Sequence, residues 1–178
     1  MSVEQRARLA CFADLLEYPG ADLQERVRRL SSTFGPEPDV EGAVNALGGE
    51  PLARVQERYT TTFDLSPVCC PYVGYHLFGE SFKRGALMSM LRQTYAAQAF
   101  TLPEWDLPDH LSAIVRFAAV CEDDELAREI AIDLIAPALR TMIAALDGGN
   151  PYGALLRALG ATLEALFAAV PVGGTRDV

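Results

Sequence analysis

The chain has 178 residues, of which half are hydrophobic, and its formal net charge is −9. This length is enough for one domain with a substantial core, and the hydrophobic fraction favours a compact fold over disorder. The acidic balance argues against nucleic acid as a partner, because binding phosphate needs a basic face. Since no apolar run reaches the roughly 18–20 residues of a membrane span, we expect no stable membrane insertion.

The N-terminus and the cysteines indicate a cytoplasmic protein. Residues 1–20 do not resemble a secretory signal, because their apolar positions follow a helical spacing, and Asp14 and Glu17 lie where a signal would have its apolar core. In the cytoplasm the four cysteines are expected to be reduced thiols. We interpret the adjacent Cys69 and Cys70 as small buried apolar residues rather than as a redox pair, since free cysteine is usually buried. Because the chain has no CxxC pair and only two histidines, we expect no metal site and no cofactor.

The N-terminal third is predicted to form four amphipathic helices, because apolar residues recur at positions i, i+3, i+4 and i+7. These helices cover residues 2–18, 21–34, 40–47 and a segment that runs from about residue 50 to Phe63. Proline and glycine, which do not propagate a helix, separate them. Residues 64–67 are expected to break the fourth helix.

Residues 68–79 are the least regular part of the chain, and they are predicted to form a loop or an extended segment. Exposed apolar loops of this kind are often binding surfaces, but the same composition also fits a loop that packs onto the core. The wider stretch of residues 59–117 holds both histidines and the single tryptophan, Trp105. We therefore expect the specific features of the protein to lie in that stretch.

The C-terminal part is predicted to contain four further helices. They cover residues 82–99, a segment that starts near Pro108, residues 122–146 and residues 151–169. Ser81 is expected to cap the first of them, and Pro108 and Asp109 to occupy the first turn of the second. Pro137 is expected to kink or break the third.

No run of β-branched residues alternates at period two, so the sequence supports no strands. Residues 100–105 are expected to form a connector, and residues 171–178 a loose tail. The fold class predicted for residues 1–170 is all-α, a single-domain helical bundle of roughly seven to nine helices.

Five short motifs carry information beyond helix formation. They are Leu15-Leu16-x-Tyr18-Pro19, Tyr59-x-x-x-Phe63, the apolar run Pro71–Phe78 with Gly79-Glu80-Ser81 after it, Arg84-Gly85, and Leu107-Pro108-Asp109-His110-Leu111. Together they resemble the TorD/DmsD/NarJ family of redox-enzyme maturation chaperones, and most closely its NarJ (nitrate reductase delta subunit) branch. The resemblance covers most of the chain and is strongest over residues 9–20 and 59–117.

This resemblance implies a cytoplasmic, non-catalytic chaperone that binds the N-terminal peptide of a molybdenum-cofactor oxidoreductase until the cofactor is inserted. The implied partner is the apo form of that catalytic subunit, and cofactor-biosynthesis proteins are further candidate partners. The sequence leaves the client open among a nitrate reductase, another oxidoreductase of the DMSO reductase superfamily and an unrelated protein. The implied client-peptide site comprises Tyr59, Tyr72, Tyr75, His76, Phe78, Glu80, Arg84, Pro108, Asp109 and His110. Several family members carry tryptophans where this chain has tyrosine and phenylalanine between residues 72 and 78.

We hypothesise an apolar groove with an acidic edge. Its lining residues are Tyr72, Tyr75, His76 and Phe78, and Asp109 and His110 lie at its edge. Nearby acids are expected to make His110 partly cationic; the alternative is that His110 only caps or packs its own helix. Residues 101–133 hold nine acidic and two basic side chains, a net charge of −7, which suits a basic amphipathic peptide.

Two other classes of function stay open. One is a helical structural or adaptor subunit that is retained in the mature redox complex. The other is a metal-dependent enzyme that uses His76, Glu80, Asp109 and His110. No phosphate-binding loop and no GxSxG nucleophile motif is present in the sequence, so we expect no catalytic residues.

Overall fold

The computed structural model describes residues 1–65, 69–103, 106–146 and 148–167, and these residues form helices, turns and one isolated bridge but no strand. The helical elements are α1 (Val3–Leu15), α2 (Leu23–Phe34), α3 (Pro38–Gly48), α4 (Leu52–Tyr59), η1 (Thr60–Asp64), α5 (Val73–Phe78), α6 (Phe82–Ala97), α7 (Leu111–Val120), α8 (Asp124–Glu129), η3 (Ile130–Ile135), α9 (Ala136–Ala145) and α10 (Pro151–Phe167). The π-helical turn η1 continues α4, and η3 joins α8 to α9. The described chain thus contains nine continuous helical segments, and the predicted all-α bundle is confirmed.

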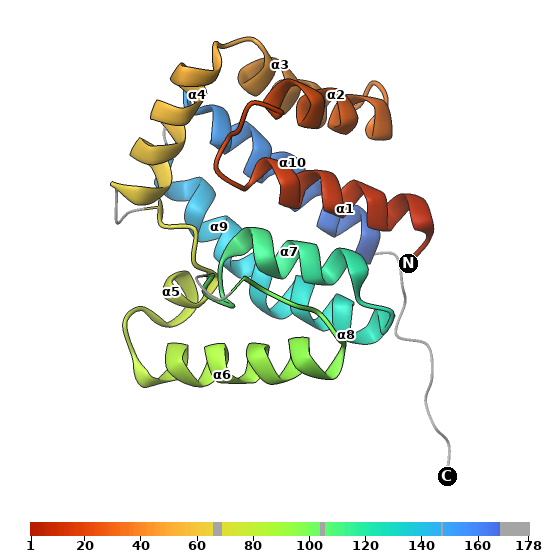
Figure 1. The fold of residues 1–178 in the computed structure, drawn as a ribbon, viewed down its shortest axis with the longest axis vertical. Coiled ribbons are helices and arrows are strands. Elements are labelled where there is room, and N and C mark those ends of the chain that lie inside the picture. The colour runs from red at the N-terminus through yellow and green to blue at the C-terminus, as the bar shows by residue number, and fades with distance from the viewer. Residues whose placement is uncertain (66–68, 104–105, 147, 168–178) are drawn as a thin grey trace.

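The helices stack from one end of the molecule to the other. Figure 1 shows α2, α3 and α4 at one end, α5 and α6 at the opposite end, and α1, α7, α8, α9 and α10 between them. In the centre, α1 packs against α2 and α7, while α10 packs against α3 and α9. The largest fully buried side chains include Phe12, Leu30, Phe117, Leu139 and Tyr152. Because these residues come from five helices, one apolar core holds the described helices together.

The first helix begins with a capping box. The backbone N–H of Gln5 donates to Ser2 Oγ at 3.1 Å, and the Gln5 side chain accepts from the Ser2 N–H at 2.7 Å. The helix ends at Leu15, three residues earlier than predicted. Pro19 accounts for the last of these residues, because a residue that precedes proline is disfavoured in helical conformation, and Tyr18 lies outside the helix.

The prediction of a loop or extended segment for residues 68–79 was partly wrong. Val73–Phe78 form the short helix α5, which ends at Gly79 with φ of 63°. Six residues are too few to show a helical repeat of apolar positions, so periodicity gave no signal. Tertiary contacts hold the element, since the Val73 N–H donates to the Asp109 carbonyl at 2.8 Å.

The long helix α6 departs from its predicted ends in two ways. Ser81 occupies the N-cap position, but its side chain accepts no capping hydrogen bond among the described residues, so the predicted cap was wrong. The helix ends at Ala97 rather than at residue 99. Ala99 adopts the left-handed region with φ of 53°, and the Phe100 N–H donates to the Tyr95 carbonyl at 2.9 Å. This closing bond is of the kind that terminates many helices.

The prediction that Pro108 and Asp109 lie in the first turn of a helix was also wrong. They form a turn, and α7 begins only at Leu111 with His110 as its N-cap. The reason is tertiary. The Pro108 carbonyl accepts a hydrogen bond from the Tyr95 hydroxyl at 2.9 Å, and the Asp109 side chain is bound elsewhere.

Residues 124–145 form a continuous path through α8, η3 and α9, so Pro137 does not break the chain into separate helices. Just before this proline the helix widens: the Ala136 N–H donates to the Ala131 carbonyl, five residues back. Such π-turns change the hydrogen-bond register, and proline, which donates no N–H, is tolerated in the first turn of α9. The break predicted over residues 64–67 begins as expected, since η1 ends at Asp64. Ser66 and Pro67, Trp105 in the connector, and the tail at 171–178 lie outside the described residues.

Candidate functional site

The predicted site is built where two segments far apart in the sequence meet. The Leu111 N–H donates to the Pro71 carbonyl at 2.7 Å, and the Val73 N–H donates to the Asp109 carbonyl at 2.8 Å. Tyr72 and His110 thereby form an isolated antiparallel bridge. These bonds fix the start of α5 against the start of α7, so side chains from both segments share one location.

A buried ion pair joins this junction to α6. Asp109 is completely buried, and its carboxylate accepts from Arg84 Nε at 2.8 Å and from Arg84 Nη2 at 3.4 Å. The guanidinium group also lies 5.1 Å from the centre of the Tyr72 ring, within range of a cation–π interaction. Asp109 was expected at the edge of the groove, but it lies inside the protein as the counterion of Arg84. Its role is to hold α6 against the turn before α7.

Gly74 allows this packing. A Cβ atom at residue 74 would lie 2.8 Å from Asp109 Oδ2, 3.0 Å from Arg84 Cγ and 3.1 Å from Leu87 Cδ2. No side chain fits there without displacing the ion pair. Sequence reasoning did not single out Gly74, because a glycine within an apolar run gives no sign of what approaches it.

His110 acts as the cap of α7. Its Nδ1 accepts from the Ser112 N–H at 3.3 Å and lies 2.7 Å from Ser112 Oγ, which donates to it. Because Nδ1 accepts both bonds, the ring proton of the neutral histidine resides on Nε2. Burial lowers the pKa of His110 and outweighs the opposing effect of nearby carboxylates, of which Glu17 is the largest. The expectation of a partly cationic His110 was therefore wrong.

The aromatic residues of α5 are partly exposed. Tyr75 and His76 are half-buried with ring centres 5.8 Å apart, and Phe78 is 39% exposed. His76 Nε2 donates to the Cys70 carbonyl at 2.7 Å, so this histidine fastens the segment before α5. Phe82, the first residue of α6, is fully exposed and was missed by the sequence analysis.

Two of the predicted site residues belong to the core instead. Tyr59 is only 5% exposed and packs edge-on against Tyr18, Phe63 and Tyr152, with ring centres 5.0–5.6 Å apart. Pro108 is buried as well. Neither side chain is exposed, and Pro108 is tied to α6 by the hydrogen bond that its carbonyl accepts from Tyr95.

The adjacent cysteines are free thiols. Cys69 is buried, as expected for a small apolar residue, and burial raises its pKa to about 12. Cys70 is only half-buried, and burial raises its pKa too. A thiol needs a lowered pKa to be a reactive nucleophile, so neither residue has the environment of a redox centre.

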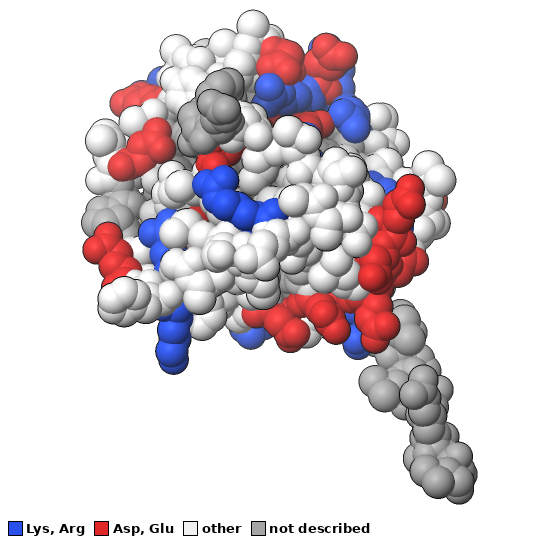
Figure 2. Space-filling model, turned by 60° about the horizontal axis from the view of Figure 1, so that its bottom comes forward, with Lys and Arg blue, Asp and Glu red and all other residues white. Residues whose placement is uncertain are grey.

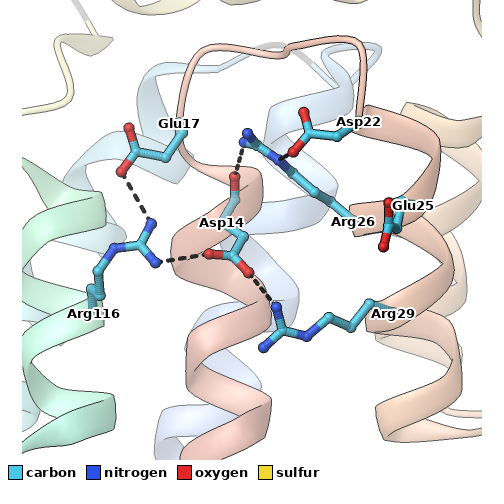
Figure 3. A pocket seen from close by; sticks show the side chains of 7 residues that line it. All are labelled: Asp14, Glu17, Asp22, Glu25, Arg26, Arg29 and Arg116. Atoms are coloured by element: carbon cyan, nitrogen blue, oxygen red, sulfur yellow. Dashed lines mark hydrogen bonds and ion pairs between the residues drawn. The ribbon is translucent and has the colours of Figure 1, made fainter.

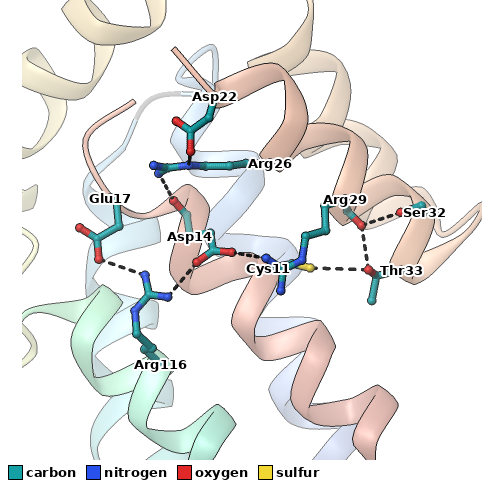
Figure 4. A network of polar contacts seen from close by, with 9 residues as sticks. All are labelled: Cys11, Asp14, Glu17, Asp22, Arg26, Arg29, Ser32, Thr33 and Arg116. Carbon is teal, nitrogen blue, oxygen red and sulfur yellow. Dashed lines mark hydrogen bonds and ion pairs between the residues drawn. The ribbon is translucent and has the colours of Figure 1, made fainter. Parts of the chain in front are cut away.

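A polar pocket of about 270 Å³ lies between α1, α2 and α7, on another part of the surface (Figure 3). At its centre the Asp14 carboxylate accepts from Arg29 and from Arg116, each at 2.8 Å. Arg116 also donates to Glu17 at 3.2 Å. Figure 4 shows that these bonds form one network, in which Arg26 joins by donating to the Asp14 carbonyl at 2.7 Å. The sequence analysis noticed both acids but could not foresee their partners.

Comparison with known proteins identifies the family. Residues 20–148 match the family described as nitrate reductase delta subunit. The chain belongs to this family. A solved structure has the same fold: an Archaeoglobus fulgidus protein, titled as a redox enzyme maturation protein, superposes with a TM-score of 0.68 at 21% identity, covering 89% of this chain and 93% of that one.

Two curated relatives of this delta-family chain are longer. It is 34% identical over 109 residues to a Bacillus subtilis protein named as the nitrate reductase molybdenum cofactor assembly chaperone NarJ, covering 61% of the chain and 58% of the relative. It is 29% identical over 144 residues to the nitrate reductase-like protein NarX of Mycobacterium tuberculosis, covering 80% of the chain and 22% of the relative. The chain thus spans just over half of one relative and about a fifth of the other.

The acidic charge of this delta-family chain is spread over several elements. Of the acids in residues 101–133, Asp109 is internal, Asp123 caps α8, and Asp124 pairs with Arg6 at 2.8 Å and with the N-terminus. Figure 2 shows a face whose centre is largely uncharged apart from a short basic strip, with acidic groups gathered along its margins. The acidic groups on this face thus lie around a largely uncharged centre.

The residues proposed for a metal-dependent enzyme do not converge. His76 binds the Cys70 carbonyl, Asp109 binds Arg84, and His110 binds Ser112. In the described part of the chain, no group of three or more His, Cys, Asp or Glu side chains is arranged to hold a metal ion. Nor does any described helix have the length and apolarity needed to cross a membrane.

Proposed function

We propose that this chain is a cytoplasmic, non-catalytic maturation chaperone for the catalytic subunit of a nitrate reductase or a related molybdenum-cofactor oxidoreductase. It binds the apo subunit before the cofactor is inserted, and proteins of cofactor biosynthesis can join that complex. The match of residues 20–148 to the delta-subunit family carries this proposal. The name of the Bacillus subtilis relative, which specifies molybdenum cofactor assembly, supports the same role.

We further propose that the N-terminal peptide of the client binds at the exposed aromatic residues of α5. Tyr75 and Phe78 offer apolar contact area, and Phe82 extends it across the turn at Gly79. A partly exposed tyrosine or phenylalanine is a common anchor in protein interfaces, because it buries a large area at a low entropic cost. Behind this surface, Asp109 and Pro108 hold the turn before α7 against α6, whereas Tyr59 packs among other aromatic residues of the core.

Acidic residues near this surface would attract a basic peptide. Glu80 lies in the turn between α5 and α6, is exposed, and has no ion-pair partner among the described residues. Charges at the rim of an interface contribute mainly to the association rate, whereas buried apolar contacts control dissociation. We therefore expect the affinity to fall as salt rises, with the loss mainly in the on-rate.

The test is calorimetric titration of the client's N-terminal peptide into the wild-type chain and three variants. Tyr75→Ala and Phe78→Ala should each weaken binding by about tenfold, because each removes an apolar anchor. Val120→Ala is the control, since Val120 is a 54% exposed apolar residue on α7 that is outside the proposed surface. Unchanged affinity in both α5 variants, at unchanged thermal stability, would place the peptide site elsewhere.

A further inference from the structure

A shallow groove of about 240 Å³ lies between α9 and α10, apart from the residues proposed for the client peptide. It is lined from α9 by Ala136, Leu139, Arg140 and Ile143, and from α10 by Arg157, Gly160, Ala161 and Glu164. Leu139 and Ile143 form an apolar floor, the first buried and the second half-buried. The middle of this seam between two packed helices is therefore open and apolar.

Small residues create the hollow. A Cβ atom placed on Gly160 would meet no described atom within 4 Å, so the space above this glycine is open. Ala136 and Ala161 also line the groove, and their short side chains keep it shallow on both sides. Ile132, one helical turn before Ala136, is 41% exposed and extends the apolar surface along the same helix. A partner side chain could fill this space without displacing any described side chain.

Two arginines flank the groove without ion-pair partners. Arg140 on α9 and Arg157 on α10 are both exposed, and neither has a carboxylate within ion-pair distance in the part of the chain that the structure describes. The arginines at 6, 8, 26, 29, 54, 84 and 116 each pair with a carboxylate, whereas those at 28, 58, 92 and 128, like the two at the groove, have no ion pair among the described residues. On a protein of net charge −9, unpaired guanidinium groups are free to meet carboxylates from outside. Glu164 is the single acid among the lining residues.

We propose that this groove binds an acidic amphipathic helix of a partner protein. Its walls, Ala136–Ile143 and Arg157–Glu164, are each eight residues long, about 10 Å at the helical rise of 1.5 Å per residue. That length accommodates about two turns of a third helix, with apolar side chains over Gly160 and Leu139. Acidic side chains on the two flanks of the partner helix would reach Arg140 and Arg157. The site is distinct from α5, so it does not depend on the proposed peptide-binding role.

Two changes to the groove test the apolar and the charged contacts separately. Gly160→Trp fills the hollow, and because glycine is a poor helix former, replacing it within α10 should not weaken the helix. Arg140→Glu with Arg157→Glu reverses the charge at both flanks. Arg58→Glu is the matched control, since Arg58 lies on α4 and has no ion-pair partner among the described residues.

The probe is a fluorescent synthetic helical peptide with leucines on one face and glutamates beside them, together with a counterpart that has lysines in place of the glutamates. The fluorescence anisotropy of each peptide is measured as the full chain is added. We expect the acidic peptide to bind the wild type and the control alike, and to bind Gly160→Trp and the double reversal at least about tenfold more weakly. The lysine peptide can bind at the proposed α5 surface, so the groove variants should bind it no more weakly than the wild type does. Failure of the acidic peptide to bind, equal binding of the acidic peptide to the wild type and the groove variants, or an equal weakening of the lysine peptide by both groove changes would overturn the proposal.

Discussion

The buried Arg84–Asp109 pair allows a sharp test of how the site is held together. Arg84→Met keeps the length of the side chain but removes both donors to a carboxylate that is completely buried. Removing one partner of a buried pair typically costs about 3–5 kcal/mol, because the remaining charge is left uncompensated. With a urea dependence of about 2 kcal/mol per molar, the unfolding midpoint should fall by about 1.5–2.5 M.

The assay is urea unfolding followed by circular dichroism, with two comparison variants. Arg92→Met makes the same change on the same helix, at an exposed arginine without an ion pair in the described chain, and should alter stability by no more than about 0.5 kcal/mol. Arg84→Met combined with Asp109→Leu removes both charges and should recover at least half of the loss. If Arg84→Met costs no more than Arg92→Met, or if the double variant recovers none of the loss, the ion pair does not hold α6 in place.

Three further predictions concern the same junction. Gly74→Ala should cost about 1–3 kcal/mol, because its Cβ would lie 2.8 Å from Asp109 Oδ2, whereas Gly85→Ala, which meets open space in α6, should be neutral or stabilising in the same melt. Since burial lowers the pKa of His110, the unfolded state binds more protons below pH 6.5, so stability should fall as the pH drops from 7 to 5. His110→Asn, which keeps a capping side chain, should flatten that dependence; an equally steep profile would contradict the assignment. Replacing Cys69 and Cys70 with alanine should leave maturation of the client intact in cells. If a folded variant no longer supported maturation, a thiol would be needed.

The fold was predictable because helical periodicity is a local property. Leu9, Phe12 and Leu16 recur at helical spacing, and all three are buried. The same reasoning failed for α5, whose six residues are held by a hydrogen bond from Val73 to Asp109 rather than by their own pattern. Short elements that depend on distant partners leave no periodic signal.

The candidate site was only partly predictable, for the same reason. The motifs around residues 72 and 109 led to two segments that do meet, through the bridge between Tyr72 and His110. Which of these side chains would be internal depends on partners far away in the sequence: Asp109 is buried because Arg84, 25 residues earlier, neutralises it. Likewise the half-buried carboxylate of Asp14 is paired with Arg116, 102 residues later. Spacing within one helix reveals neither relation.

The central claim is that this chain acts on its client before the cofactor is inserted and then leaves. The most direct measurement is purification of the tagged chain from cells of its source organism in which molybdenum cofactor synthesis is blocked, with quantification of the nitrate reductase catalytic subunit that copurifies. We expect an abundant complex with the apo subunit in those cells, and little of it once cofactor synthesis is restored. Stable copurification with the mature, cofactor-loaded enzyme would instead identify a retained adaptor subunit, and absence of the subunit under both conditions would contradict a chaperone role.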